Sequence, residues 1–345
     1  MNSTMKTAYA ILIFLLLFSG KLAFSQAGAG DKAGGARNQA YVDSIKNSNY
    51  IWTFPAWGKK ISKRGIDIPY PVGIMTNIYV GSQDVNISDL QVGFNDGPLI
   101  PLDFIKFGKV TANIQTVTVR PDVWVLPFMD LYGIVGINRA QTSVEVVSPI
   151  KFNTQANFKG YTYGFGTTFA GGYHGFITII DFNHTWSFLD KIDDAVQATM
   201  VTPRLGYNFH FDNPIKTVAF WVGTTGFFVN RTTQGTINLS DLQSTSVSDA
   251  DLTGIINGTS DWLDNLTPAQ KLVLKQIAEK IRDKIEGGSG DATISYSLKK
   301  RPTHTWSMLV GGQYQFSHRW QVRTEVGFLG GRTSLLLSGN YRFRW

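Results

Sequence analysis

The chain has 345 residues and a formal charge of +7, and 13% of its residues are aromatic while only 17% are charged. The aromatic content excludes an intrinsically disordered chain. The absence of cysteine excludes a disulfide scaffold and a thiolate metal site. Only one apolar run, near the start, approaches the length of a membrane-spanning helix, so the composition also excludes a helical membrane protein.

Residues 1–25 have the pattern of a secretory signal peptide. Lys6 supplies the positive charge, an apolar run follows as far as Phe18, and Ala23-Phe24-Ser25 offers small residues at a cleavage site. Removal of this segment takes Lys6 and Lys21 and no acidic residue, so the charge falls to +5. That charge is too small for a chain of this length to indicate a nucleic-acid partner.

Residues 26–71 lie before the alternating segments. The first part is rich in alanine and glycine and predicts a flexible tail, whereas the second part combines Trp52 and Trp57 with lysines such as Lys59 and Lys60. Aromatic and basic residues together could bind an anionic lipid headgroup, or they could belong to a segment that packs on or inside a barrel. We expect a periplasmic tail that includes a possible plug.

The rest of the chain, residues 72–345, alternates between apolar and polar residues, most clearly after residue 159. Along 176–188, for example, Phe182 and Trp186 fall on one face, and Asp181 falls on the other. A period of two is typical of strands whose two faces meet different surroundings.

Three features favour a membrane barrel over a soluble sandwich. The segments run to about 12–15 residues, whereas strands of globular proteins usually have five or six. Aromatic residues gather near the segment ends, as at a membrane interface. Charged residues such as Arg204 and Glu325 lie in mid-segment on the polar face, where a barrel has its lumen. The pattern predicts an all-β, antiparallel, up-and-down transmembrane barrel.

The last strand carries a recognisable ending. Tyr341, Phe343 and Trp345 alternate with polar residues and finish the chain. This ending resembles the C-terminal assembly signal of Gram-negative outer-membrane β-barrel proteins. The resemblance implies a location in the outer membrane and the barrel-assembly machinery as a partner, and it indicates no particular family.

We expect about 12 strands, within a range of 10–14, because outer-membrane barrels of bacteria have even numbers. If the C-terminus is periplasmic, the turn at 317–319 is periplasmic and the insertion 232–302 is an external loop. The segments are 72–81, 85–95, 110–127, 131–139, 143–153, 159–172, 174–188, 195–211, 216–231, 303–317, 319–331 and 333–345.

The insertion contains one clear helix signal, over residues 267–286. Thr267 and Gln270 form a capping box around Pro268, and apolar residues then recur at helical spacing. This amphipathic helix could be a lid or plug over the barrel, or it could fold back on its own loop. The stretch 240–265 before it is acidic, which is compatible with a calcium site but is more typical of a solvated loop.

The predicted lumen suggests a function in transport. An excess of arginine would select anions, so we expect a passive, porin-like diffusion channel for small and possibly anionic solutes. In a narrow barrel the same charges could instead pair and plug the lumen. The candidate lumen residues are Asp181, Arg204, Asn208, His210, Arg323, Glu325 and Arg342.

Two other functions remain open. The barrel could be a surface structural protein or adhesin that binds through the loop 232–302. It could also be a lipid hydrolase, for which His210 is the one histidine on the lumen face. Since none of the familiar nucleophile, zinc or nucleotide motifs occurs, we expect no catalytic residues, no metal and no cofactor. The expected partners are outer-membrane lipid, the barrel-assembly machinery and small solutes.

Overall fold

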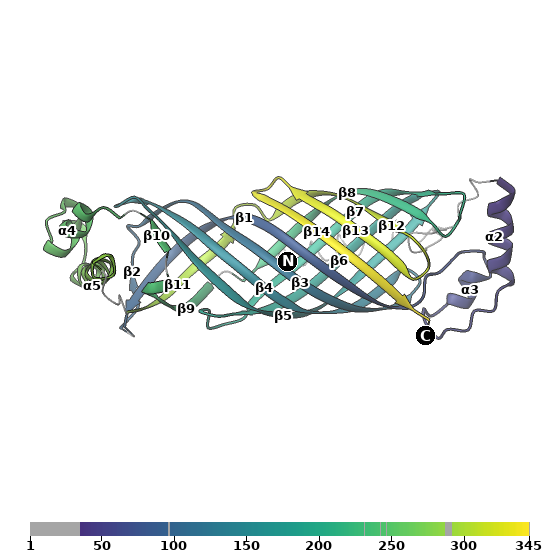
Figure 1. Cartoon of the computed structure of the whole chain (residues 1–345), viewed down its shortest axis with the longest axis horizontal. Coiled ribbons are helices and arrows are strands. Elements are labelled where there is room, and N and C mark those ends of the chain that lie inside the picture. The colour runs from purple at the N-terminus through teal and green to yellow at the C-terminus, as the bar shows by residue number, and fades with distance from the viewer. Residues whose placement is uncertain are drawn as a thin grey trace, which may run out of the picture.

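The computed structural model describes residues 35–95, 97–230, 232–241, 243–245, 247–286 and 292–344. The predicted signal peptide and Trp345 of the predicted assembly signal lie outside these residues. Ten antiparallel strands form a closed barrel, because the last strand, β14, pairs with the first, β1 (Figure 1). The strands are β1 (Val72–Phe94), β3 (Lys106–Leu126), β4 (Met129–Ser148), β5 (Phe152–Tyr173), β6 (Phe176–Leu189), β7 (Val196–His210), β8 (Thr217–Val229), β12 (Trp306–Gln315), β13 (Trp320–Phe328) and β14 (Arg332–Phe343).

The count of ten is lower than the predicted twelve, because predicted segments merge into longer strands. Residues 72–81 and 85–95 form the single strand β1, and 131–139 continues into β4 beyond its predicted end. The polar stretch around Gln83 resembles a turn in sequence. In the barrel it remains in the ladder, where Gln83 pairs with Ala112 on one side and Arg332 on the other. Polar residues are tolerated there because they point into a polar interior.

The barrel is much longer on one side than on the other. We call the end where β1 begins and β14 finishes the terminal end, and the opposite end the distal end. Strands β1, β3, β4 and β5 continue distally beyond their neighbours (Figure 1). Four strands outside the barrel complete this extension: β2 (Ile100–Pro101), β9 (Thr232–Asn238), β10 (Gln243–Thr245) and β11 (Thr293–Pro302). β11 takes over the edge of β1 from Val85, where β14 has ended.

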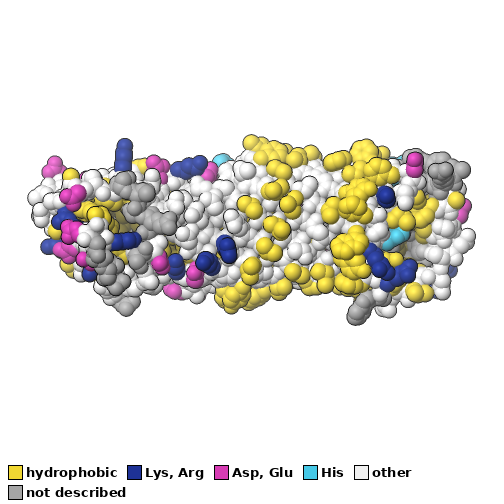
Figure 2. Space-filling view, viewed as in Figure 1, with side chains coloured by type: hydrophobic (Ala, Val, Ile, Leu, Met, Phe, Trp, Pro, Cys, Tyr) yellow, Lys and Arg dark blue, Asp and Glu magenta, His cyan; other side chains and the backbone are white. Residues whose placement is uncertain are grey.

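An apolar belt surrounds the ten-stranded part. Every barrel strand exposes large apolar side chains, and several are more than half exposed. Aromatic residues concentrate at two levels of the belt, which Figure 2 shows as bands of hydrophobic atoms. The terminal band includes Phe176, Tyr207, Phe209, Tyr314, Trp320 and Tyr341, and the distal band includes Tyr161, Tyr163, Phe165, Trp186 and Trp306.

These two bands are spaced as the interfaces of a bilayer require. Phe176 and Trp186 stand ten positions apart on β6. For a tilted strand that distance corresponds to roughly 25 Å, the height of the apolar band of an outer-membrane barrel. An apolar belt of this size would aggregate in water, so its solvent is lipid. The charged side chains in Figure 2 lie mainly beyond the belt, at the distal end.

The segment before β1 covers the terminal end of the barrel. It contains helices α2 (Gly35–Asn47) and α3 (Gly58–Ser62), which lie off that end in Figure 1. The backbone N–H of Ala56 donates to the carbonyl of Val125, at 2.9 Å. The side chain of Asp67 lies 2.8 Å from Nε2 of His318, in the turn between β12 and β13, and accepts a hydrogen bond from Tyr41 at 2.6 Å.

The distal insertion holds helices α4 (Asp249–Asn257) and α5 (Pro268–Ile285) and the short 3-10 helices η1 (Leu239–Asp241) and η2 (Asp261–Asn265). Helix α5 begins at the Thr267 capping box, in which the hydroxyl and the Gln270 side chain each accept a backbone N–H. Within the part of the chain that the structure describes, none of the helices combines the length and apolarity needed to cross a membrane.

Candidate functional site

A layer of charged side chains fills the lumen at the level of the membrane belt. Arg204 of β7 and Glu325 of β13 form a bidentate pair, with Nε–Oε1 at 2.7 Å and Nη2–Oε2 at 3.0 Å. Arg323 binds the same carboxylate, and the indole N–H of Trp221 donates to it at 3.0 Å. Arg204 and Glu325 are each only 6% exposed, so this cluster lies inside the barrel and not at its mouth.

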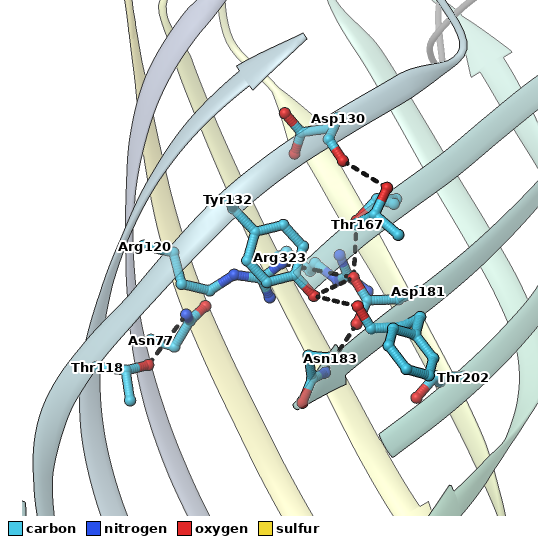
Figure 3. A network of polar contacts seen from close by, with 12 residues as sticks. Asn77, Thr118, Arg120, Asp130, Tyr132, Thr167, Asp181, Asn183, Thr202 and Arg323 are labelled. Carbon is cyan, nitrogen blue, oxygen red and sulfur yellow. Dashed lines mark hydrogen bonds and ion pairs between the residues drawn. The ribbon is translucent and has the colours of Figure 1, made fainter. Parts of the chain in front are cut away.

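Asp181 of β6 is the centre of a second cluster in the same layer (Figure 3). It accepts hydrogen bonds from Tyr132 at 2.9 Å, from Thr168 at 2.7 Å and from Asn183 at 3.1 Å. The guanidinium of Arg120 lies 3.5 Å from the carboxylate and stacks over the Tyr132 ring, 3.5 Å from its centroid. Four side chains of the barrel wall therefore bind the Asp181 carboxylate.

Two further arginines are held above and below this layer. Towards the terminal end, Arg342 of β14 bonds to Asp122 at 2.7 Å and to the carbonyl of Tyr70 at 2.6 Å. Towards the distal end, Arg332 donates to Gln83 at 2.7 Å and lies over the Phe227 ring. The terminal contact ties the N-terminal segment into the mouth of the barrel.

The structure brings most of the predicted lumen residues together, but it shows them in ion pairs and hydrogen bonds. The residues Asp181, Arg204, Asn208, His210, Arg323, Glu325 and Arg342 all lie on the inner side of the wall, and His210, the last residue of β7, lies at its terminal end. The expected free cationic lining is not what the structure shows, because Arg204, Arg323 and Arg342 are each paired with a carboxylate. The arrangement corresponds to the alternative in which charges pair and plug a narrow lumen.

Sequence analysis missed several partners in these clusters. Arg120, Asp122 and Tyr132 belong to β3 and β4, where Pro121 interrupts the alternation and obscures which residues face inwards. The available signal was spacing: an acid and a base two positions apart share one face of a strand, as Arg120 and Asp122 do. Arg332 is the first residue of β14, directly after the glycine turn, and was not predicted as a lumen residue.

A large cavity lies in the distal extension, which we call the chamber. Its volume is about 600 Å³, within the range of roughly 300–1,000 Å³ typical of small-molecule sites. Strands β1, β3, β4, β5, β9 and β11 contribute to its wall, and helix α5 covers it. The lining is overwhelmingly apolar and includes Ile87, Leu90, Phe104, Phe107, Val144, Val146, Phe152, Phe158, Trp262, Leu274, Ile277 and Ile281.

The chamber exists because the inner face of the wall changes polarity along the strands. On β4 the inward residues are Asp130 and Tyr132 near the terminal end, but Val144 and Val146 in the extension. On β1 a bulge between Ser88 and Gln91 shifts the register, which lets Leu90 and Val92 face inwards. A one-residue shift moves every following side chain to the other face.

Helix α5 is fixed over the chamber by polar contacts at both of its ends. The Gln270 amide donates to the carbonyl of Pro101 at 2.7 Å, and Lys284 reaches the carbonyl of Leu239 at 3.5 Å. Arg282 donates to Thr253 at 2.7 Å and thereby ties α5 to α4. The apolar side of α5, including Ile277, faces the chamber. The helix is therefore part of the wall of a binding site.

Two lysines are the basic groups of this apolar lining. Lys284 comes from α5, and Lys300 comes from β11, opposite Ile87. Burial lowers the pKa of Lys300 to about 8. The ammonium of Lys300 lies 5.8 Å from the centroid of the Phe158 ring, a cation–π distance. A ligand in the chamber would therefore meet a hydrocarbon surface whose charged groups are the lysines Lys284 and Lys300.

The acidic stretch of the insertion serves the helices of the extension. Asp249 and Asp251 occupy the first turn of α4, where Asp251 bonds to the capping residue Ser248, and Asp241 pairs with Lys191 at 3.2 Å. Negative charge is favourable at a helix N-terminus. In the described ranges, no group of three or more histidine, aspartate and glutamate side chains is arranged to hold a metal ion.

Comparison with solved structures aligns the chain with outer-membrane proteins at low sequence identity. The beta domain of the Bordetella autotransporter BrkA aligns with 79% of this chain and 100% of its own length, at 9% identity and a TM-score of 0.33. The outer-membrane protein OprG of Pseudomonas aeruginosa aligns with 80% of this chain and 98% of its own, at 10% identity and a TM-score of 0.35. The translocator domain of NalP from Neisseria meningitidis aligns with 88% and 93%, at 7% identity and a TM-score of 0.33.

No protein-family model and no curated protein sequence matches the chain. The class of the molecule follows from its own features: a closed antiparallel barrel, an apolar belt between two aromatic bands and a polar interior. The chain is a transmembrane β-barrel of the outer-membrane class.

Proposed function

We propose that this protein is an outer-membrane transport barrel that binds a small apolar solute in the chamber at its distal end. The chamber carries this proposal, because it combines a volume of about 600 Å³ with an apolar lining and a fixed helical cover. In this proposal the insertion 232–302 lies outside the cell, so that the chamber is the first site that an incoming solute meets, and the N-terminal segment 26–71 lies in the periplasm.

The paired charges in the lumen favour a barrier over an open pore. Arg204, Arg323 and Glu325 share one cluster, and Asp181 is held by its neighbours in the same layer. Breaking several buried ion pairs at once is costly. Solute passage would therefore require this layer to rearrange, and the chamber would hold the solute until it does.

Binding of a neutral apolar probe tests the proposal. We expect 4-phenylbutan-1-ol to bind the full-length barrel in detergent, as measured by saturation-transfer NMR. Ala278→Trp, which places an indole in the chamber from the buried face of α5, is expected to abolish the signal. The matched control is Leu272→Trp on the exposed face of the same helix, which should leave binding unchanged. Equal binding by both variants would contradict a chamber site.

The earlier alternatives make different predictions. A passive anion channel requires conductance in planar bilayers without ligand and a shift of the reversal potential in Arg323→Glu. An adhesin requires loss of partner binding on deletion of residues 240–290, with the barrel otherwise intact. A lipid hydrolase requires ester hydrolysis that His210→Ala abolishes. None of these roles requires an enclosed apolar cavity of this volume, so we rank them below solute binding.

A further inference from the structure

We infer that the solute bound in the chamber is an amphiphile with one anionic head group, such as a carboxylate, that lies at Lys300 while its hydrocarbon body lies among the apolar side chains. This inference rests on the proposed function and makes it more specific. It follows from three observations: the position of Lys300, the ion pair that its neighbour Lys299 forms with Asp89, and the charge of the whole chamber lining.

Lys300 and Lys299 are adjacent on β11, so their side chains point to opposite faces of the strand. Lys299 points outwards and pairs with Asp89, with Nζ–Oδ2 at 2.7 Å. Lys300 points into the chamber, where its contact within the described part of the chain is the face of the Phe158 ring. The fold therefore supplies a carboxylate to the solvent-facing lysine and an aromatic ring to the chamber-facing one.

A cation in an apolar cavity is costly unless an anion accompanies it. Among the described residues that line the chamber, none is an aspartate or a glutamate, and the basic ones are Lys284 and Lys300. Lys284 donates to the carbonyl of Leu239 at 3.5 Å. The lining therefore attracts an anion and repels a cation, and the counterion that Lys300 lacks from the wall would come with the ligand.

The apolar side chains of the lining indicate that the body of the ligand is apolar. Phe104, Phe152 and Trp262 surround the cavity together with branched aliphatic side chains, and such a surface offers a polar body few partners. A sugar or a peptide would leave its donors and acceptors unpaired there. A single acidic group on an aliphatic or aromatic body fits both parts of the cavity.

The experiment compares two probes that share a body and differ in the head group. We expect 4-phenylbutyrate to bind the wild-type barrel about tenfold more tightly than 4-phenylbutan-1-ol at pH 7, the effect of one charge-assisted hydrogen bond. Lys300→Met is expected to remove this preference and leave the alcohol bound as before. Lys300→Arg should preserve the preference, and Lys299→Met is the matched control for loss of a lysine on the same strand.

The outcomes separate this inference from the proposed function. If neither probe binds, the chamber is not a solute site and the proposed function is overturned. If both probes bind equally well, or if Lys300→Met keeps the preference for the acid, the chamber remains a solute site but the anionic head group is wrong. Should Lys300→Met fail to fold, Lys300→Gln provides the same comparison with a neutral polar side chain.

Discussion

Arg204 and Glu325 are joined by two hydrogen bonds across the lumen, although they lie 121 positions apart in sequence and on strands that do not pair with each other. Their link spans the sector of the wall formed by β8 and β12, and Arg323 and Trp221 complete it. At the height of the membrane, ion pairs and hydrogen bonds thus fill the lumen of this barrel. The apolar chamber lies beyond this layer, in the distal extension.

Glu325→Gln is expected to lower the free energy of unfolding by about 3–5 kcal/mol, because it leaves two buried guanidinium groups without their carboxylate. Urea titration of the barrel in lipid vesicles measures the change. The matched control is Asp89→Asn, which breaks an exposed pair with Lys299 and is expected to cost less than about 1 kcal/mol. Similar effects of the two substitutions would contradict a structural role for the lumen layer.

The same layer is expected to limit ion flow. Replacing both partners, as in Arg204→Ala with Glu325→Ala, removes bulk and charge together and should raise single-channel conductance in planar bilayers above that of the wild type. Removal of the distal insertion 240–290 should leave conductance low, because the barrier lies in the lumen. High conductance of the wild type and no change in the double variant would show that the layer is not the barrier.

The contact between Asp67 and His318 predicts a pH optimum for docking of the N-terminal segment. The hydrogen bond to Asp67 raises the pKa of His318. Burial acts to raise the pKa of Asp67, but the hydrogen bond and charge of His318, together with the hydrogen bonds from Tyr41 and the backbone of Ile68, hold that pKa below its usual value. The stabilisation from His318 is present below its unfolded pKa, roughly 6.5, and is lost as the pH rises through the raised folded value.

The stabilisation from Asp67 depends on pH in the opposite direction. It is present above the unfolded pKa, roughly 3.9, and is lost as the pH falls through the lowered folded value. Docking should therefore be firmest between about pH 4 and 6.5 and should weaken in alkali. Hydrogen exchange of the α2 amides, expressed as protection relative to the intrinsic exchange rate at each pH, measures docking. Asp67→Asn should remove the dependence, and greater protection at pH 9 than at pH 6 would contradict the assignment.

Binding of the acidic probe is expected to depend on pH through Lys300. Because burial brings the pKa of Lys300 to about 8, affinity for 4-phenylbutyrate should be constant near pH 6–7 and fall as the pH rises above 8. The other titratable groups of the described lining are Lys284 and Tyr296, and burial raises the pKa of Tyr296 to about 12. Lys284→Met should keep the pH dependence, whereas Lys300→Arg should remove it. Binding of the alcohol should not change with pH.

The C-terminal aromatic residues are expected to matter for assembly in the cell more than for the folded state. Tyr341 and Phe343 lie on the outer face of β14, where Tyr341 contacts Trp320 at a ring distance of 4.8 Å. Replacing both by alanine should reduce the amount of folded barrel in outer membranes while refolding into detergent proceeds normally. Replacing Leu335 and Leu337 of the same face by alanine is the control. Equal loss in both assays would argue for packing and against a recognised signal.

The sequence predicted the architecture of the membrane-embedded half well, for a physical reason. Along β6 and β14 the lipid-facing and lumen-facing residues alternate without interruption, so Asp181 and Arg342 could be placed inside the wall from spacing alone. The number of strands came out too high because Gln83 and its neighbours look like a turn when only local sequence is considered. Pairing on both sides, which is a long-range property, keeps them in β1.

Local sequence patterns could not predict the chamber. Alternation shows that Val144 and Val146 share a face, but not whether that face meets lipid or the inside of an extension. The pairing of Lys300 with Ile87 and its approach to Phe158 join three distant parts of the chain. Likewise, arginines that look like a cationic lining in sequence are neutralised by carboxylates from other strands, such as Asp122 for Arg342.

The most direct test of solute binding in the chamber is to find where an apolar solute binds. A diazirine analogue of 4-phenylbutyrate can be photolysed with the wild-type barrel in lipid vesicles, and the labelled peptides identified by mass spectrometry. We expect the label on α5 around Ile277 and on the distal part of β4 around Val146, with competition by unlabelled 4-phenylbutyrate. Labelling confined to belt residues such as Leu205 and Val222, without competition, would contradict a binding site in the chamber.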